Sequence, residues 1–157
     1  MFWRLVKTAI FTVLVPGTVG LVVPYLLKNS FEILGDAVPG LLGILLFLLG
    51  VTMYLWCAWD FVSKGFGTPA PIDAPRVLVV NGLYRFTRNP MYVGVLAVIF
   101  GQAIAYGSRS VVIYGAAMLF AFDSFVRFYE EPKLSRKFGA QYEEYCRRVP
   151  RWVFRIG

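Results

Sequence analysis

Four uncharged or nearly uncharged stretches constrain this chain more than any other feature. They cover residues 8–27, 38–59, 91–107 and 110–126. Each approaches the roughly 20 apolar residues that a helix needs to cross the hydrocarbon layer of a bilayer. In that layer a helix is favoured because it satisfies its backbone hydrogen bonds internally. The sequence therefore predicts an all-α fold, a polytopic membrane helical bundle with about four transmembrane helices, in a single domain over residues 1–157.

The composition supports membrane insertion and argues against a nucleic-acid-binding module. Hydrophobic residues make up 58% of the chain and charged residues 16%, and the formal net charge is +7. A nucleic-acid-binding module gathers its basic residues on one soluble face, whereas apolar runs separate them here. We therefore expect membrane lipids as partners and no nucleic acid, and the oligomeric state is left open.

The basic residues are divided unequally between the connections. If the amino terminus is cytoplasmic, all 16 Lys and Arg residues except Lys28 and Arg109 fall on the cytoplasmic side of a four-helix arrangement. Cytoplasmic segments of membrane proteins carry such an excess of Lys and Arg. We therefore predict an integral membrane protein whose two termini are both cytoplasmic.

Missing residue types limit the chemistry. The chain has no histidine, which excludes imidazole bases, imidazole metal ligands and Ser-His or Cys-His pairs. Cys57 lies in an apolar run and Cys146 in a basic segment, which favours two free thiols over a disulfide. We predict no metal site, and proton chemistry limited to carboxylates, tyrosines, lysines or water.

Proline and glycine predict a kinked first helix. Pro16, Gly17, Gly20 and Pro24 all lie in this stretch, and a proline removes a backbone donor from a helix. In a bilayer, neighbouring helices must satisfy the carbonyl groups that lose their partners. The stretch therefore predicts a packed bundle.

The third and fourth stretches predict a helical hairpin. The connection around Gly107 to Arg109 is so short that the two helices must be antiparallel neighbours. Both helices are short for a full crossing. Small residues on both would allow their backbones to approach closely: Gly94, Ala97, Gly101 and Ala105 on the first, and Gly115, Ala116 and Ala117 on the second.

Two longer polar segments lie on the predicted cytoplasmic side. Glycines and prolines at the start of residues 63–90 prevent a continuous helix, and aromatic residues alternate with basic ones from Tyr84 to Arg88, which argues against disorder. We expect an ordered loop over the cytoplasmic end of the bundle. From Pro132, apolar residues recur at helical spacing, which predicts a carboxyl-terminal interfacial helix with Glu130 and Glu131 at the positive end of its dipole.

Arg127, Glu130 and Glu131 form a charged cluster where the last apolar stretch ends. Each alone has an ordinary structural explanation, since arginines snorkel from helix ends and carboxylates favour helix starts. Together they lie within about one helical turn, beside spans rich in small residues where ionisable groups are costly to keep. Such a cluster fits a polar ligand whose tail or partner is apolar.

Two motifs resemble a known enzyme family. The sequences GLYRFTRNPMYVG at residues 82–94 and EEPKLSRKFGAQYEEYCRRVPR at residues 130–151 resemble the paired signatures of the isoprenylcysteine carboxyl methyltransferase and phospholipid methyltransferase superfamily of integral membrane enzymes. The resemblance covers roughly residues 65–151. Asn89 stands where many members have histidine, so a hydrogen-bond donor fits there but an imidazole does not.

The resemblance implies methyl transfer from S-adenosyl-L-methionine at the cytoplasmic membrane face, with the cofactor held by residues 63–94 and 127–151. This cofactor carries a sulfonium, an ammonium, a carboxylate and a ribose diol, so its site needs carboxylates, donors and aromatic faces. By similarity to the family, the cofactor-binding residues are Tyr84, Arg88, Asn89, Pro90, Tyr92, Gly94, Glu130, Glu131, Phe138, Tyr142 and Tyr145.

The resemblance also indicates Arg127 and Glu131 as catalytic residues that position the acceptor. Arg127 would pair with an anionic nucleophile, whereas Glu131 could take the proton of an amine or thiol. We expect a lipidic or small hydrophobic acceptor, methylated on a carboxylate, an amine or a thiol. The alternative is a non-catalytic membrane scaffold or lipid-binding protein of the same fold. A reductase lacks support, because no nicotinamide-binding glycine fingerprint follows a strand.

Overall fold

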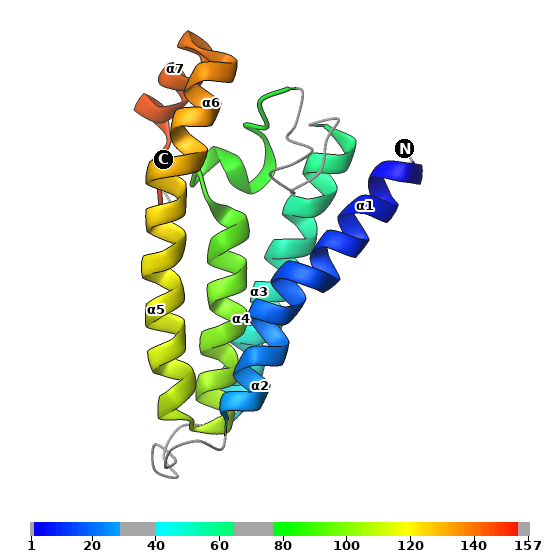
Figure 1. The fold of residues 1–157 in the computed structure, drawn as a ribbon, viewed down its shortest axis with the longest axis vertical. Helices are drawn as coiled ribbons and strands as arrows, with labels where there is room; N and C mark the ends of the chain where they lie inside the picture. Colours follow the sequence, from blue (N-terminus) through cyan, green and yellow to red (C-terminus); the bar gives the residue numbers. More distant parts are fainter. Residues whose placement is uncertain (1, 29–39, 65–76, 154–157) are drawn as a thin grey trace.

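The predicted all-α membrane bundle is confirmed (Figure 1). The computed structural model describes residues 2–28, 40–64 and 77–153. Within these ranges η1 and η4 are π-helical and η3 is a 3-10 helix. The elements in chain order are α1 (Phe2–Thr12), η1 (Val13–Val22), α2 (Val23–Leu27), α3 (Gly40–Ser63), η3 (Gly82–Arg85), α4 (Pro90–Tyr106), α5 (Arg109–Phe125), η4 (Val126–Glu130), α6 (Glu131–Phe138) and α7 (Ala140–Arg148).

Three continuous helices in the described ranges are long and apolar enough to cross a membrane: Phe2–Leu27, Gly40–Ser63 and Arg109–Phe138. Helix α4 is equally apolar but has 17 residues, which rise about 25 Å against roughly 30 Å of hydrocarbon. The hairpin predicted from the short connection is confirmed. Gly107 ends α4 in the left-handed conformation, and the Ser108 side chain caps α5.

Helices α3 and α4 pack backbone against backbone through glycines. A Cβ added at Gly50 would lie 2.6 Å from the carbonyl oxygen of Gly94, and one at Gly101 would lie 2.6 Å from the backbone nitrogen of Phe47. The sequence predicted this close approach between α4 and α5, and that prediction is wrong. Helix α3 carries its own glycines at the matching spacing, whereas Gly115 of α5 makes room for a side chain, the ring of Phe100.

The first helix is continuous, and its neighbours satisfy the carbonyls that Pro24 leaves without a backbone donor, as predicted. Pro24 cannot donate to Gly20 in an α-helical turn or to Val19 in a π-helical turn. The amide of Gln102 on α4 donates to the Gly20 carbonyl, and the Tyr114 hydroxyl on α5 donates to the Val19 carbonyl at 2.9 Å. Both side chains therefore tie η1 to the hairpin.

The carboxyl-terminal helix differs from the prediction. No helix starts at Pro132. The chain instead runs without interruption from Arg109 to Phe138, and Glu130 and Glu131 both have right-handed helical backbone angles. Because a proline ring clashes with the carbonyl four residues earlier, a π-helical turn just before Pro132 relieves the conflict, and the Glu131 amide donates to Val126. Although α6 begins at Glu131 with Pro132 in its first turn, it continues η4 without a break, so the two glutamates do not lie at a free amino-terminal end of a helix.

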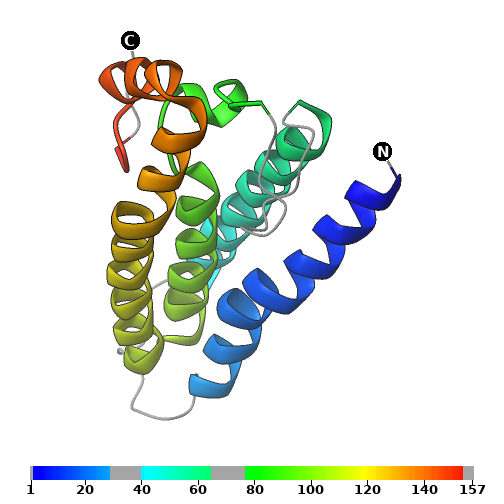
Figure 2. The same ribbon diagram turned by 45° about the horizontal axis from the view of Figure 1, so that its top comes forward.

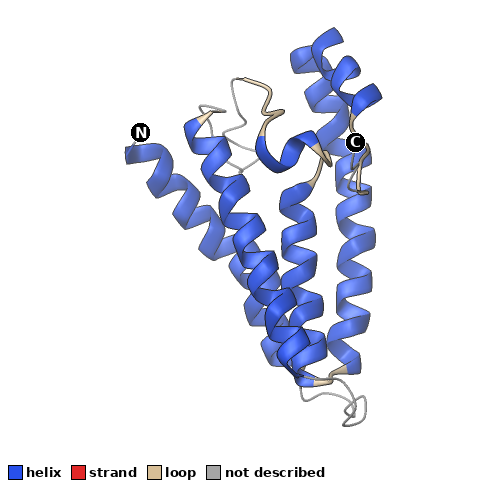
Figure 3. Cartoon of the chain, turned by 180° about the vertical axis from the view of Figure 1, so that it is seen from behind, coloured by secondary structure: helices blue, strands red, loops and turns tan. Residues whose placement is uncertain are grey.

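The helix breaks later, at Gly139. This residue has φ +52°, a value that favours glycine, and α7 then turns away from α6 (Figure 2). The starts of α1 and α4, the end of α3, η3, α6 and α7 all lie at one end of the bundle (Figure 3). Of the loop predicted there, residues 65–76 lie outside the described ranges, while residues 77–89 contain η3 and lead into α4.

Candidate functional site

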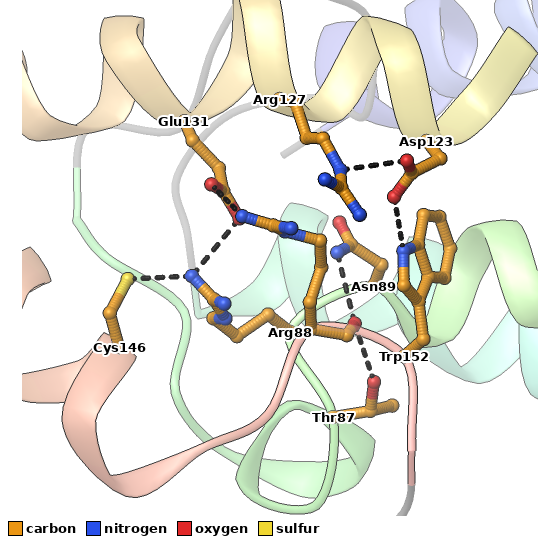
Figure 4. Close-up of polar contacts among 9 residues, drawn as sticks. Thr87, Arg88, Asn89, Asp123, Arg127, Glu131, Cys146 and Trp152 are labelled. Atoms are coloured by element: carbon orange, nitrogen blue, oxygen red, sulfur yellow. Dashed lines mark hydrogen bonds and ion pairs between the residues drawn. The ribbon is translucent and has the colours of Figure 1, made fainter.

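The chain after α7 turns back toward the start of α4. Val149 has an extended backbone, and Pro150 cannot continue a helix. Residues 149–152, which we name the return segment, therefore leave the α7 axis and lie beside the residues that precede α4 (Figure 4).

Hydrogen bonds hold the return segment in place. The backbone nitrogen of Arg88 donates to the Pro150 carbonyl at 2.9 Å. The Arg151 carbonyl accepts from the Thr87 hydroxyl at 3.0 Å and from the Asn89 amide at 3.1 Å. Thr87 and Asn89 are buried, so leaving either donor unpaired would be costly. The motif at residues 82–94 is thus hydrogen-bonded to the end of the motif at residues 130–151.

Glu131 is the centre of an ion-pair network. Arg151 binds it bidentately, with Nε 2.8 Å from Oε1 and Nη2 2.7 Å from Oε2. Arg88 approaches the same carboxylate, with Nη1 3.0 Å from Oε1. The hydrogen bonds to Glu131 raise the pKa of Arg151 above its ordinary value. Two guanidinium groups therefore share one carboxylate, and the network carries a net positive charge.

Glu130 has a different environment. The Tyr92 hydroxyl donates to its Oε1 at 2.8 Å, and no arginine ion pair to Glu130 occurs in the described part of the chain. The Tyr92 ring packs against Phe122 and edge-on against Trp152, with centroids 4.8 and 6.4 Å apart. Burial raises the pKa of Glu130, and the nearby Lys133 ammonium opposes this effect. Glu130 is therefore a carboxylate of this cluster that the described arginines do not pair with.

Asp123 and Arg127 lie one turn apart on the helix that carries both glutamates. Arg127 Nε is 2.7 Å from Asp123 Oδ2, and the Trp152 indole nitrogen donates to Asp123 Oδ1 at 2.7 Å. The Arg127 side chain is 51% exposed. Arg127 therefore belongs to a second network, next to that of Glu131 (Figure 4).

Helix α7 closes the cluster with tyrosines and a thiol. The Tyr145 hydroxyl donates to the Tyr84 carbonyl at 2.7 Å, and Arg88 Nη1 donates to Cys146 Sγ at 2.9 Å. Burial raises the pKa of Tyr84, Tyr142 and Tyr145. These phenols therefore remain neutral donors and ring faces at physiological pH.

The remaining predicted residues lie at the edges of the site. Pro90 is buried at the first position of α4. Gly94 faces α3, where an added Cβ would lie 2.9 Å from the Gly50 carbonyl. Phe138 ends α6, with the Lys137 ammonium 5.5 Å from its ring centroid. Helix packing explains Gly94, and its predicted contact with a cofactor stays a prediction.

Sequence reasoning gave no role to several residues of the site. Asp123 carried a signal, because an ionisable residue inside an apolar stretch usually has a function. Thr87, Cys146, Arg151 and Trp152 carried none that separates them from ordinary surface residues. The roles of Thr87, Arg151 and Trp152 depend on the turn at Pro150, which brings the return segment against α4. The role of Cys146 depends on α7 lying beside Arg88.

The arrangement provides carboxylates, guanidinium groups, phenols and ring faces, but no group of three or more His, Cys, Asp or Glu residues that could hold a metal ion occurs in the described ranges.

Residues 38–141 match the sequence model of a protein family described as phospholipid methyltransferase. The match covers about two thirds of the 157 residues. It includes Arg88, Arg127 and both glutamates, and it ends one residue before Tyr142.

Proposed function

Since the chain belongs to the phospholipid methyltransferase family, a family of membrane methyltransferases, we propose that it transfers a methyl group from S-adenosyl-L-methionine to a lipidic or small hydrophobic acceptor. The proposed enzyme is similar to isoprenylcysteine carboxyl methyltransferases, and the acceptor group that it methylates is a carboxylate, an amine or a thiol. One observation carries the proposal: both family motifs, far apart in sequence, place charged side chains together at one end of a membrane bundle.

The side chains at this end suit the charges of the cofactor. Arg88 Nε is buried without a hydrogen-bond partner in the described part of the chain, so it has a donor for the cofactor's carboxylate. The Glu130 carboxylate binds the ammonium or ribose groups in this proposal. Of the hydroxyl and guanidinium donors described above, Tyr92 is the one that contacts it. When bound, the cofactor supplies a methyl group activated by its sulfonium.

The proposed cofactor site is the predicted one, and α7 lies over it. Asn89 holds the return segment beside Arg88, and the phenol rings of α7 provide faces for the adenosine group and the sulfonium. The proposed contacts are made by Tyr84, Arg88, Asn89, Pro90, Tyr92, Gly94, Glu130, Glu131, Phe138, Tyr142 and Tyr145.

Arg127 and Glu131 have different roles in this proposal. Both oxygens of Glu131 already accept from arginine, which leaves little capacity to take a proton. Glu131 therefore orders Arg88 and Arg151. Arg127, with a half-exposed guanidinium, pairs with an anionic group of the acceptor. Methyl transfer is an in-line displacement, so alignment and exclusion of water are the main contributions of these residues.

The proposed orientation places this end of the bundle in the cytoplasm. Lys64, Arg88, Arg127 and Arg151 all lie at this end, and the residues described at the opposite end include Lys28 and Arg109. Cytoplasmic loops are enriched in such basic residues. Both termini and the active site are then cytoplasmic.

The test is binding of S-adenosylmethionine and its demethylated product to the detergent-purified chain by isothermal calorimetry. Binding by the native protein and its loss in Glu131→Ala are expected. Glu144→Ala serves as the matched control, because Glu144 pairs with arginines of its own helix, away from the site. Folded native protein that binds neither compound would contradict the proposal and favour a scaffold or lipid-binding protein.

The acceptor is tested with the labelled cofactor and three probes: N-acetyl-S-farnesyl-cysteine, phosphatidylethanolamine and dodecanethiol. These present a carboxylate, an amine and a thiol on apolar tails. We expect one to be methylated and Arg127→Ala to lower the rate. Native rates in Arg127→Ala would refute the role of Arg127 while leaving the family membership intact.

A further inference from the structure

Asp123 lies near the end of an apolar stretch of a membrane helix. An ionised carboxylate there needs polar partners, whereas α5 needs no side chain to complete its own backbone hydrogen bonds. Both of its oxygens are nevertheless used, one by Trp152 and the other by Arg127. The side chain is 27% exposed. These bonds, rather than the fold of α5, explain its presence.

The bond to Arg127 is made at a particular atom. Asp123 accepts from Nε, which fixes the plane of the guanidinium without occupying the outer edge formed by its two Nη atoms. That edge can still bind a carboxylate or phosphate group bidentately. A long, half-exposed arginine otherwise samples many rotamers. Asp123 therefore limits the directions in which Arg127 presents its binding edge.

Trp152 connects this pair to the return segment. Its indole nitrogen holds the other Asp123 oxygen, and its ring lies edge-on to Tyr92. The preceding residue, Arg151, is fixed by Glu131 and Asn89. The orientation of Arg127 thus depends on the return segment being closed over the start of α4 (Figure 4).

We propose that Asp123 and Trp152 are positioning residues, which orient Arg127 toward the methyl acceptor when the return segment is closed. The proposal rests on the proposed function, in which Arg127 pairs with an anionic group of the acceptor. Asp123 and Trp152 act through Arg127 and do not contact the acceptor themselves.

The kinetic test uses Trp152→Phe, which keeps most of the ring and removes the donor, and Asp123→Asn, which keeps the shape and removes the charge. With the probe that the native chain methylates fastest, we expect kcat to fall by about tenfold to a hundredfold, while the Kd for S-adenosylmethionine stays within about twofold of native. Trp59→Phe on the exposed face of α3 is the matched control and should leave both unchanged.

A double-variant cycle separates positioning from general damage. If Trp152 acts through Arg127, Arg127→Ala combined with Trp152→Phe should be no slower than Arg127→Ala alone. Multiplied losses, or native kcat in Trp152→Phe and Asp123→Asn, overturn the positioning role while the methyltransferase proposal stands.

A second readout requires no acceptor. Hydrogen exchange of the Arg127 Nε–H, assigned by its absence in Arg127→Lys, should accelerate at least tenfold in Trp152→Phe if the indole holds Asp123 in place. Unchanged exchange contradicts the proposal. If the native chain methylates none of the three probes, the proposed function fails, and this measurement still decides whether Trp152 orients Arg127.

Discussion

The α3–α4 contact and the charged networks around Glu131 are adjacent regions held together in opposite ways. Between α3 and α4, glycine backbones touch, and no side chain can be added without displacing a helix. Around Glu131, arginines from the two family motifs share a carboxylate, and ion pairs can exchange partners. The first region is suited to hold a fixed scaffold, and the second to rearrange around a ligand.

The largest expected effect breaks the scaffold. Gly50→Leu would place a Cβ 2.6 Å from the Gly94 carbonyl, so α3 and α4 must separate. We expect a loss of roughly 3 kcal/mol or more, measured by SDS titration in mixed micelles. Gly40→Leu is the control, since nothing lies within 4 Å of a Cβ at Gly40. Equal stability of the two variants would show that the close contact does not limit packing.

Removing the shared carboxylate should cost less. Glu131→Ala leaves Arg88 and Arg151 without their common partner, and we expect a loss of roughly 2 kcal/mol, less than in a fully buried pair because water reaches part of these groups. The same SDS titration measures it. Glu144→Ala should change stability by under about 0.5 kcal/mol. A larger loss for Glu131→Ala than for Gly50→Leu would reverse the contrast between the two regions.

The junction of η1 with α4 combines the two kinds of contact, because a side chain there replaces a backbone donor. Gln102→Leu should cost about 1 to 2 kcal/mol by leaving the Gly20 carbonyl unpaired. In a Pro24→Ala background, which restores a backbone donor, the same substitution should cost under about 0.5 kcal/mol. The test compares the unfolding free energies of the native chain, Gln102→Leu, Pro24→Ala and the double variant. Equal costs of Gln102→Leu in both backgrounds would refute the idea that the Gln102 amide replaces the backbone donor missing at Pro24.

The smallest effect concerns the hydrogen bond between α7 and η3. Tyr145→Phe removes a donor to the Tyr84 carbonyl and should cost about 1 kcal/mol at neutral pH. Burial raises the pKa of Tyr145 in the folded chain, so its contribution to stability is complete below the unfolded value of about 10 and declines as pH rises further.

Melting temperatures measured between pH 8 and 11 test whether the stability contributed by Tyr145 declines as the pH rises. The native chain should lose stability more steeply above pH 10 than Tyr145→Phe does. Equal declines in the two proteins would mean that Tyr145 ionises as easily in the folded chain as in the unfolded one, and would contradict the prediction.

The sequence predicted well which residues form helices, and less well which helices pack against each other. Uncharged stretches of spanning length identify membrane helices because each satisfies its own backbone, and the prolines of the first stretch correctly indicated help from neighbours. Gly94 and Gly101 were correctly expected to allow close packing, but with the wrong helix. Periodicity places a small residue on a face and does not say which helix covers that face.

At the charged end of the bundle, too, some features were predictable from the sequence and others were not. Composition and motif spacing alone determined that this is an all-α membrane protein with Arg127, Glu130 and Glu131 where the last span ends, because hydrophobicity and backbone satisfaction are properties of local sequence. The π-helical turn before Pro132, which relieves the steric clash of the proline ring, keeps the glutamates inside one long helix. Only tertiary structure decided that the turn at Pro150 brings Arg151 to Glu131 and Trp152 to Asp123. These contacts form only after the bundle has assembled, because their partners lie about 20 to 30 residues apart along the chain.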